Sequence, residues 1–297
     1  MPSFLVSLSQ WAKRAKAPLA RFRIPILILA AIAFVIGMIW SISALGLKWS
    51  DVALAPIALL ALVIAPLSVA YSAVNMQLMG KAIGTKIGFL YGAQISAFAQ
   101  IAELLPIPGG AIVRTAALMK SGGKTGNSAG LVVAFALLWI ACAAAGCGLA
   151  LLHISPAAYA PLIGGVTLIA GIVLWLGTSF GWAIAISALF LRILGLSIVS
   201  LRVIVAFAVI GIAVGAQDAL AFAFALILGS AASIVPAGLG IGEGLSALMA
   251  GAVEVDPAAA FIAAAIGRLV GLAVNMCAAL WFSTFPMHSA SISDPKQ

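Results

Sequence analysis

A Gly/Pro-rich break at residues 230–244 is the feature that most constrains the fold, because the sequence around it is apolar enough to lie in lipid. Pro236 ends any helix that arrives from Phe222, since proline lacks the N–H that a helix needs. Four glycines follow it: Gly238, Gly240, Gly242 and Gly244. Irregular backbone at membrane depth persists only where protein buries it or water reaches it, as in re-entrant loops. We therefore expect a re-entrant hairpin with arms at 219–235 and 240–251.

A single carboxylate, Glu243, lies inside this break, near the start of the helix that resumes with Leu245. The first turn of a helix has unpaired N–H groups and the positive end of the helix dipole. A buried carboxylate is therefore favoured at this position.

A second Gly/Pro break followed by a short apolar segment occurs earlier in the chain, before residue 120. Pro106 matches Pro236, and the triplet Ala117-Leu118-Met119 matches Ala247-Leu248-Met249, both at a spacing of 130 residues (236 − 106 and 247 − 117). The equal spacing predicts an internal repeat that covers nearly the whole chain. The segment 89–105 is too short to cross a membrane, so we expect it to descend into the membrane and 110–119 to return.

The composition excludes a soluble domain. Hydrophobic residues make up 65% of the 297 and charged residues only 7%, with a mean hydropathy of +1.26. An all-α polytopic membrane protein is expected, with two re-entrant helical hairpins and about six transmembrane helices. The expected spans are 24–45, 52–75, 128–152, 157–176, 182–212 and 257–282. Pro56 and Pro66 should bend the second span, and Arg192 and Arg202 interrupt the fifth, whose first turns are expected along the membrane interface.

The net charge of +8 indicates orientation rather than nucleic-acid binding, because no basic stripe is interleaved with aromatic residues. Residues 1–23 carry five cations and are expected to form a basic interfacial segment at an anionic leaflet. With the N-terminus cytoplasmic, all the loop lysines except Lys48 fall inside. Lys48 and the loop acids fall outside, in agreement with the positive-inside rule. Three spans then separate the hairpins, so the second repeat is inverted. The expected division is 24–152 for the first repeat, 153–283 for the second and 284–297 for a polar tail.

Ionisable residues at membrane depth are few: Glu103, Arg114, Glu243, Arg268 and, near the end of the fifth span, Arg202. Each costs roughly 2.5–3.5 kcal/mol at the centre of a lipid-facing helix, so they should face one another or a wet cavity. Glu103 ends its half-helix, where the dipole opposes a carboxylate, and it needs a cation such as Arg114 or Arg268. Arg268 and Asn275 share one helical face with small residues, which suits a cavity lining. Ion pairs that only hold the hairpins together remain an alternative.

Cysteine and histidine do not indicate a metal or redox site. Cys142, Cys147 and Cys277 lie within apolar spans without the spacing of a disulfide framework, which favours packing roles. His153 and His288 stand alone at the ends of spans. No cofactor is expected.

Two motifs resemble one known family. The run Pro236-Ala-Gly-Leu-Gly-Ile-Gly-Glu243 with Ala265-Ile-Gly-Arg268 resembles the second half of the lysylphosphatidylglycerol synthase transmembrane (flippase-like) family. Pro108-Gly-Gly-Ala-Ile-Val-Arg114 resembles the first half. The resemblance covers most of 24–283 and implies a lipid translocase core of inverted repeats without the aminoacyl-transferase domain. Where a Glu-Arg pair is expected in the third span, this chain has Leu137-Leu138, which argues against a symmetric two-site mechanism.

Two other function classes stay open. Undecaprenyl pyrophosphate phosphatases also combine inverted repeats with re-entrant hairpins, but this chain lacks their serine before the arginine and their paired glutamates. A structural membrane partner without transport is the other class.

The sequence thus predicts a non-enzymatic lipid translocase in a bacterial inner membrane that moves an anionic or phosphate-bearing lipid between leaflets. Arg114, Arg268 and the half-helix N-termini would hold the headgroup, while Glu103 and Glu243 would balance the cations. The predicted substrate site comprises Glu103, Pro108, Gly109, Gly110, Arg114, Pro236, Gly238, Gly240, Gly242, Glu243, Arg268 and Asn275. Membrane lipids are the expected partners, nucleic acid is not, and homo-oligomerisation stays open.

Overall fold

The chain folds as an all-α polytopic membrane protein. The computed structural model describes residues 25, 28–104, 108–231 and 238–284, and among these no residue lies in a strand. Six helices are long and apolar enough to cross a membrane: Ile28–Leu45, Leu54–Ala82, Thr125–Leu151, Pro156–Phe180, Trp182–Val209 and Pro257–Ser283. The predicted class and the six spans are therefore confirmed.

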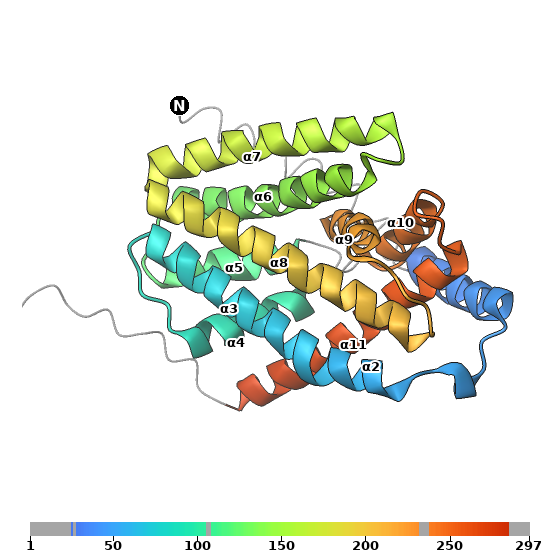
Figure 1. Ribbon diagram of the computed structural model, residues 1–297. Coiled ribbons are helices and arrows are strands. Elements are labelled where there is room, and N and C mark those ends of the chain that lie inside the picture. The colour runs from blue at the N-terminus through green and yellow to red at the C-terminus, as the bar shows by residue number, and fades with distance from the viewer. Residues whose placement is uncertain (1–24, 26–27, 105–107, 232–237, 285–297) are drawn as a thin grey trace, which may run out of the picture.

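Figure 1 shows how the labelled helices follow one another along the chain. After the helix Ile28–Leu45 come η1 (Trp49–Asp51), α2 (Leu54–Leu59), η2 (Leu60–Ile64), α3 (Ala65–Ala82), α4 (Phe89–Ala102), α5 (Gly109–Lys120), α6 (Thr125–Leu151), η3 (Pro156–Ala158), α7 (Tyr159–Phe180), α8 (Trp182–Val209), α9 (Ala216–Ala231), α10 (Ile241–Ala250) and α11 (Pro257–Ser283).

The second span differs from its predicted bounds, because its helix continues through Asn75 to Ala82. Asn75 does not end the helix, since its side-chain amide donates to the carbonyl oxygen of Tyr71 one turn earlier at 3.0 Å. Between Pro56 and Pro66, where bends are predicted, the helix contains a π-helical turn, η2 (Leu60–Ile64). Proline cannot donate a backbone hydrogen bond, so a departure from α-helical pairing beside it is expected.

Two pairs of short helices form the predicted hairpins. In α4 and α5 the chain has 14 and 12 helical residues, and in α9 and α10 it has 16 and 10. At about 1.5 Å per residue, even the longest of these spans about 24 Å, less than a hydrocarbon core of about 30 Å. Each hairpin is therefore re-entrant.

Both halves of the chain use the same order of elements: two long helices, a short-helix hairpin and one more long helix. The packing repeats as well, since α3 contacts α4 as α8 contacts α9, and α5 contacts α6 as α10 contacts α11. Each hairpin also packs on the closing helix of the other half, α4 on α11 and α9 on α6. The two repeats are thus interlocked around one centre.

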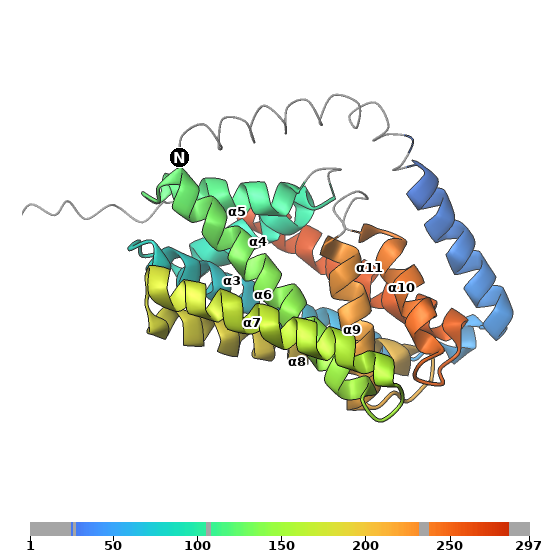
Figure 2. The ribbon, with the colours of Figure 1, turned by 90° about the horizontal axis from the view of Figure 1, so that it is seen from above.

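The hairpins enter from opposite ends of the molecule. In Figures 1 and 2 the first hairpin opens toward the end where α7 turns into α8, and the second opens toward the end where α6 turns into α7. Three long helices lie between them, an odd number, so the second repeat is inverted as predicted.

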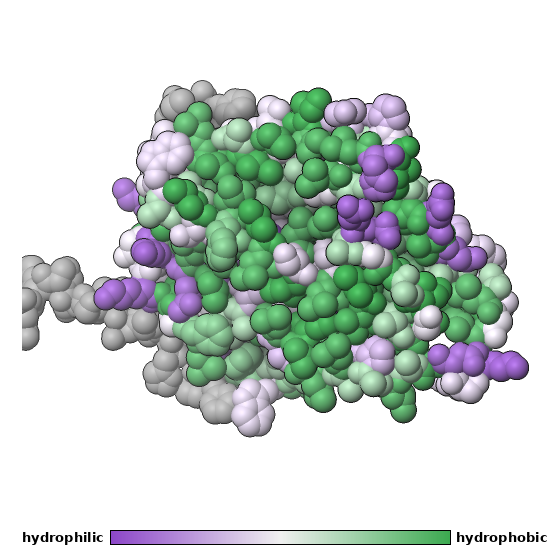
Figure 3. Space-filling model, in the orientation of Figure 1, coloured by the Kyte–Doolittle hydropathy of each residue, from purple (hydrophilic) through white to green (hydrophobic). Residues whose placement is uncertain are grey.

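The outer surface suits a lipid environment. Figure 3 shows a broad apolar belt on one face, with most hydrophilic residues near its two ends. The helix Ile28–Leu45 lies at the rim, where Phe34 packs on Phe261 of α11 with 6.1 Å between ring centroids. Cys142 and Cys147 are buried in the apolar core, in accord with packing roles, and Cys277 is exposed.

Candidate functional site

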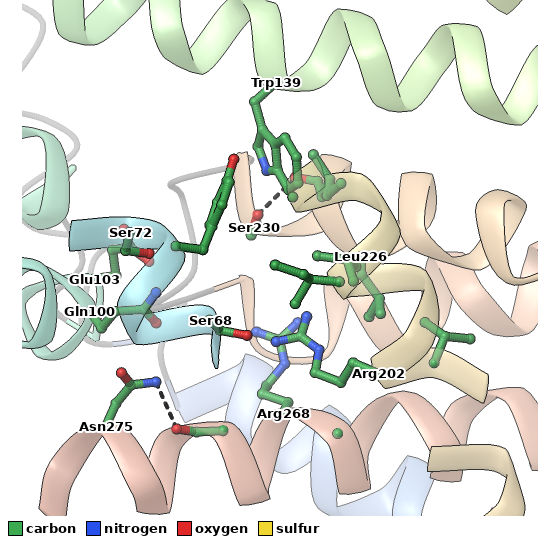
Figure 4. A pocket seen from close by; sticks show the side chains of 18 of the residues that line it. Ser68, Ser72, Gln100, Glu103, Trp139, Arg202, Leu226, Ser230, Arg268 and Asn275 are labelled. Atoms are coloured by element: carbon green, nitrogen blue, oxygen red, sulfur yellow. Dashed lines mark hydrogen bonds between the residues drawn. The ribbon is translucent and has the colours of Figure 1, made fainter. Parts of the chain in front are cut away.

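A cavity of about 380 Å³ lies where the two hairpins meet. The first hairpin contributes Gln100 and Glu103 from the end of α4 and Arg114 from α5, and the second contributes Ser230 and Ser246. The long helices α3, α6, α8 and α11 complete the lining, part of which is seen in Figure 4. Both hairpins therefore contribute polar side chains to one shared cavity inside an apolar protein.

Glu243 is completely buried and has two partners. One carboxylate oxygen accepts a hydrogen bond from the backbone N–H of Gly240 at 2.9 Å, which caps the start of α10. The other oxygen lies 2.5 Å from Nε of Arg268 on α11. Because Glu243 stands behind Arg268 and does not line the cavity, it sets the position of the arginine rather than touching a ligand.

Two glycines of this break let the backbone approach other groups closely. Gly240 has a φ of +80°, a conformation that favours glycine, and it directs the chain into α10. A Cβ at Gly242 would lie 2.6 Å from Nη2 of Arg268. Glycine at this position therefore leaves room for the guanidinium that Glu243 holds. Gly238 lies against the backbone of Gly229, and Pro236 falls outside the described residues.

In the first hairpin, Glu103 forms an ion pair with Arg114, with 3.2 Å between Oε1 and Nη2. The Glu103 carboxylate also lies against Gly110 in the first turn of α5, as Gly109 lies against the backbone of Ala102. The positive end of the α5 dipole and Arg114 thus offset the unfavourable place of Glu103 at the end of α4. Pro108 is the N-cap residue of α5 and is exposed.

The carboxylates therefore face the starts of both returning arms. Glu243 caps its own helix α10, and Glu103 reaches the first turn of α5 from the preceding arm. The predicted use of these helix N-termini as anion sites is therefore limited, since one of the donors at α10 is already taken. Arginine side chains are the remaining groups that can attract an anion into the cavity.

Arg202 of α8 lines the cavity beside Arg268. Figure 4 shows the two guanidinium groups next to each other, with the hydroxyl of Ser68 directed toward them. Among the described residues, Glu243 pairs with Arg268 but no carboxylate pairs with Arg202. Two adjacent arginines, of which one has a carboxylate partner, form a site that favours an added anion.

Arg192, also on α8, is a cavity-lining arginine that sequence reasoning did not assign to the site. Its side chain is buried, its Nη1 donates to the hydroxyl of Tyr71 at 2.9 Å, and its Cζ lies 5.1 Å and 5.6 Å from the ring centroids of Phe135 and Trp139. The available signal was a lone arginine within an apolar helix. It was overlooked because the first turns of the fifth span were assigned to the interface, whereas α8 is one continuous helix.

Asn275 lines the cavity as predicted, but its side-chain amide donates to the carbonyl oxygen of Gly271 at 2.8 Å (Figure 4). Of the predicted site residues, the cavity is lined by Glu103, Arg114, Arg268 and Asn275, and the glycines and Glu243 support them from behind.

The charge balance of the lining favours anions. The cavity is lined by four arginines: Arg114, Arg192, Arg202 and Arg268. Among the described residues Glu103 is the one carboxylate in the lining, and Glu243 contacts Arg268 from outside it. Opposite charges attract far more strongly in such a partly enclosed space than in water. The described residues contain no group of three or more His, Cys, Asp or Glu side chains that could hold a metal ion.

Comparison with known proteins adds no assignment. No protein-family model matches this chain, and no curated protein sequence matches it either.

Proposed function

We propose that this chain is a lipid translocase that moves an anionic, phosphate-bearing lipid between the leaflets of a bacterial inner membrane, with its N-terminus in the cytoplasm. The observation that carries the proposal is the arginine-lined cavity bordered by both inverted hairpins. An arginine excess inside an apolar protein is costly unless it serves a ligand or an ion path.

In the proposed mechanism the phosphate group of the lipid enters the cavity while its acyl chains stay in the bilayer. Arg202 and Arg268 would bind the phosphate oxygens, since a guanidinium matches an oxyanion with two parallel N–H donors. Arg114 would receive the headgroup at the first hairpin. Because the hairpins enter from opposite ends, small motions of each would expose the cavity to one leaflet at a time.

The two glutamates would compensate the charges of the arginines when no lipid is bound. Glu243 holds Arg268, and Glu103 holds Arg114, so neither arginine is left without a counter-charge when the site is empty. A bound phosphate would take over part of that role. Each arginine would then exchange its glutamate partner for phosphate instead of losing a partner, which keeps the free-energy cost of each step low.

The motifs support the proposal, since the segments that resemble the flippase-like family are the ones that form the hairpins and hold Arg114 and Arg268. The apolar belt and the six spans support a multi-pass membrane location. The bacterial inner membrane and the cytoplasmic N-terminus belong to the proposal.

Leaflet exchange in liposomes tests the function. The purified protein, reconstituted with a fluorescent phosphatidylglycerol, should accelerate the loss of dithionite-protected fluorescence compared with protein-free vesicles. Arg202→Gln should slow the exchange at least tenfold, because it removes a cavity arginine that is not paired with a carboxylate and lies beside Arg268. Lys81→Gln, which removes a cation outside the cavity, should exchange at the wild-type rate.

The same vesicles separate the alternatives. Release of inorganic phosphate from a polyprenyl pyrophosphate, without lipid exchange, would support the phosphatase class and overturn the proposal. Neither activity across a panel of anionic lipids would favour the structural membrane partner.

A further inference from the structure

Arg192 has a buried charge that the contacts within the protein do not balance. The residue is 7% exposed, and its Nε has no hydrogen-bond partner. A guanidinium has five N–H donors, and the hydroxyl of Tyr71 accepts from Nη1 at 2.9 Å. Among the described residues no carboxylate forms an ion pair with it.

The aromatic rings near Arg192 do not replace a counter-ion. Phe135 and Trp139 of α6 lie at cation–π distance from its Cζ, and such contacts offset part of the desolvation cost. A ring face, however, cannot accept the directed hydrogen bonds that a guanidinium offers. Arg192 lines the cavity, so an anion there could complete its partners.

This part of the cavity is separate from the Arg202–Arg268 pair. Positions 192 and 202 are ten residues apart on α8, which is about 15 Å along the helix axis. Arg192 contacts Tyr71 of α3 and the rings of α6, whereas Arg202 lies against Gly271 of α11, where a Cβ would be 3.9 Å from its Nη1. The two guanidinium groups are therefore directed to different walls.

We infer that Arg192 and Tyr71 form a second phosphate subsite, so that the cavity holds two phosphate-type oxyanions at once, one at each end. Free N–H donors of the guanidinium and the Tyr71 hydroxyl bind the oxyanion, and Trp139 borders it. The inference rests on the proposed function for its role, as a second station along the path of the headgroup.

Binding stoichiometry in detergent tests the inference without requiring transport. Purified full-length protein is titrated with inorganic phosphate and, separately, with short-chain dihexanoyl phosphatidylglycerol, and bound equivalents are counted by calorimetry and native mass spectrometry. Wild-type protein should bind two equivalents of at least one probe. Arg192→Met and Arg202→Met should each bind one, and Tyr71→Phe should weaken one of the two sites about fivefold. Cys142→Ala, a buried change near Arg192 that does not touch the cavity, should still bind two.

Two equivalents of phosphate would assign the subsites to the free oxyanion, and two of the lipid alone would show that the acyl chains are needed; both support the inference. One equivalent in wild-type protein that Arg192→Met leaves unchanged would overturn it. One equivalent that either arginine variant abolishes would also overturn it, since the arginines would then share a single anion. Two bound equivalents without leaflet exchange would overturn the proposed function and leave this inference standing.

Trp139 provides a readout that does not depend on the folding of Arg192→Met. Its ring centroid lies 5.6 Å from the guanidinium carbon, so an anion at Arg192 should change its emission. The emission change on titration should be present in wild-type protein and in Arg202→Met, and absent in Trp139→Phe. An unchanged Trp139 signal at saturating concentrations of both probes would contradict the second subsite.

Discussion

Arg268 on α11 holds the fully buried carboxylate of Glu243 on α10, with 2.5 Å between Nε and Oε1. This pair joins the returning arm of the second hairpin to the last transmembrane helix. The same arginine lines the cavity, so one residue links the stability of the hairpin to the chemistry of the site.

The first prediction concerns this pair. Arg268→Ala should lower the free energy of unfolding by about 3–5 kcal/mol, because it leaves a buried carboxylate without a cation. Glu243→Gln should cost less, because the amide oxygen can still accept from the N–H of Gly240 and the lost charge leaves Arg268 bordering the cavity. Thermal unfolding in detergent, followed by tryptophan fluorescence, measures both.

The double variant Glu243→Leu/Arg268→Met separates structure from function. This variant should regain part of the stability that Arg268→Ala loses, but it should not catalyse leaflet exchange. Full exchange by this double variant would show that the pair is only structural.

The second prediction concerns the pair Glu103–Arg114, whose side chains are 36% and 25% exposed, in contrast to the buried pair Glu243–Arg268. Solvent weakens such a pair, so Glu103→Gln should change the free energy of unfolding by at most about 1 kcal/mol. A loss as large as that expected for Arg268→Ala would contradict this. Because the change frees Arg114, it should instead increase retention of phosphatidylglycerol during purification, measured by phosphorus assay.

The third prediction concerns the close crossing of α9 and α10. A Cβ at Gly229 would lie 2.5 Å from the backbone nitrogen of Gly242, which cannot move aside as a side chain can. Gly229→Ala should therefore destabilise the protein by about 1–3 kcal/mol. The matched control is Gly244→Ala on α10, where a Cβ meets no atom within 4 Å. The control should be neutral or stabilising by up to about 1 kcal/mol, since alanine is the better helix former. Equal melting temperatures for the two variants would refute the close crossing.

The fourth prediction concerns topology. In a cysteine-free background, Thr125→Cys after the first hairpin and Gln217→Cys before the second should react with an impermeant maleimide on opposite faces of the membrane. Both positions are exposed at helix ends. Ser50→Cys, in the loop after the first span, should label together with Gln217→Cys on the outer face. Labelling of positions 125 and 217 on the same face would be incompatible with inverted repeats.

Much of the fold could be read from local sequence because lipid imposes strict rules on the backbone. Long apolar segments must be helices, and Pro and Gly can break them only where protein or water covers the break. The 130-residue spacing of Pro106 and Pro236 was therefore sufficient for the repeat, and the odd number of spans for its inversion. The ends of helices could not be read in the same way. Asn75, for example, does not end its helix, because its side-chain amide donates to a backbone carbonyl oxygen of the same helix.

The free-energy cost of an isolated buried charge predicted in part that Glu243 pairs with Arg268. The same cost predicted that Glu103 has a cationic partner. By contrast, only the tertiary structure decided which cations face the cavity and which carboxylates stand behind them. Arg192 and Arg202 lie ten residues apart on one apolar helix, and nothing in that local sequence distinguishes a buried arginine from one at the interface. Their environment depends on where α3, α6 and α11 pack around α8, which is a property of contacts between segments distant in the chain. The sequence by itself therefore determined a membrane protein with two opposed broken helices, because lipid allows few other solutions. Packing between the repeats decided the charge and shape of the space between them.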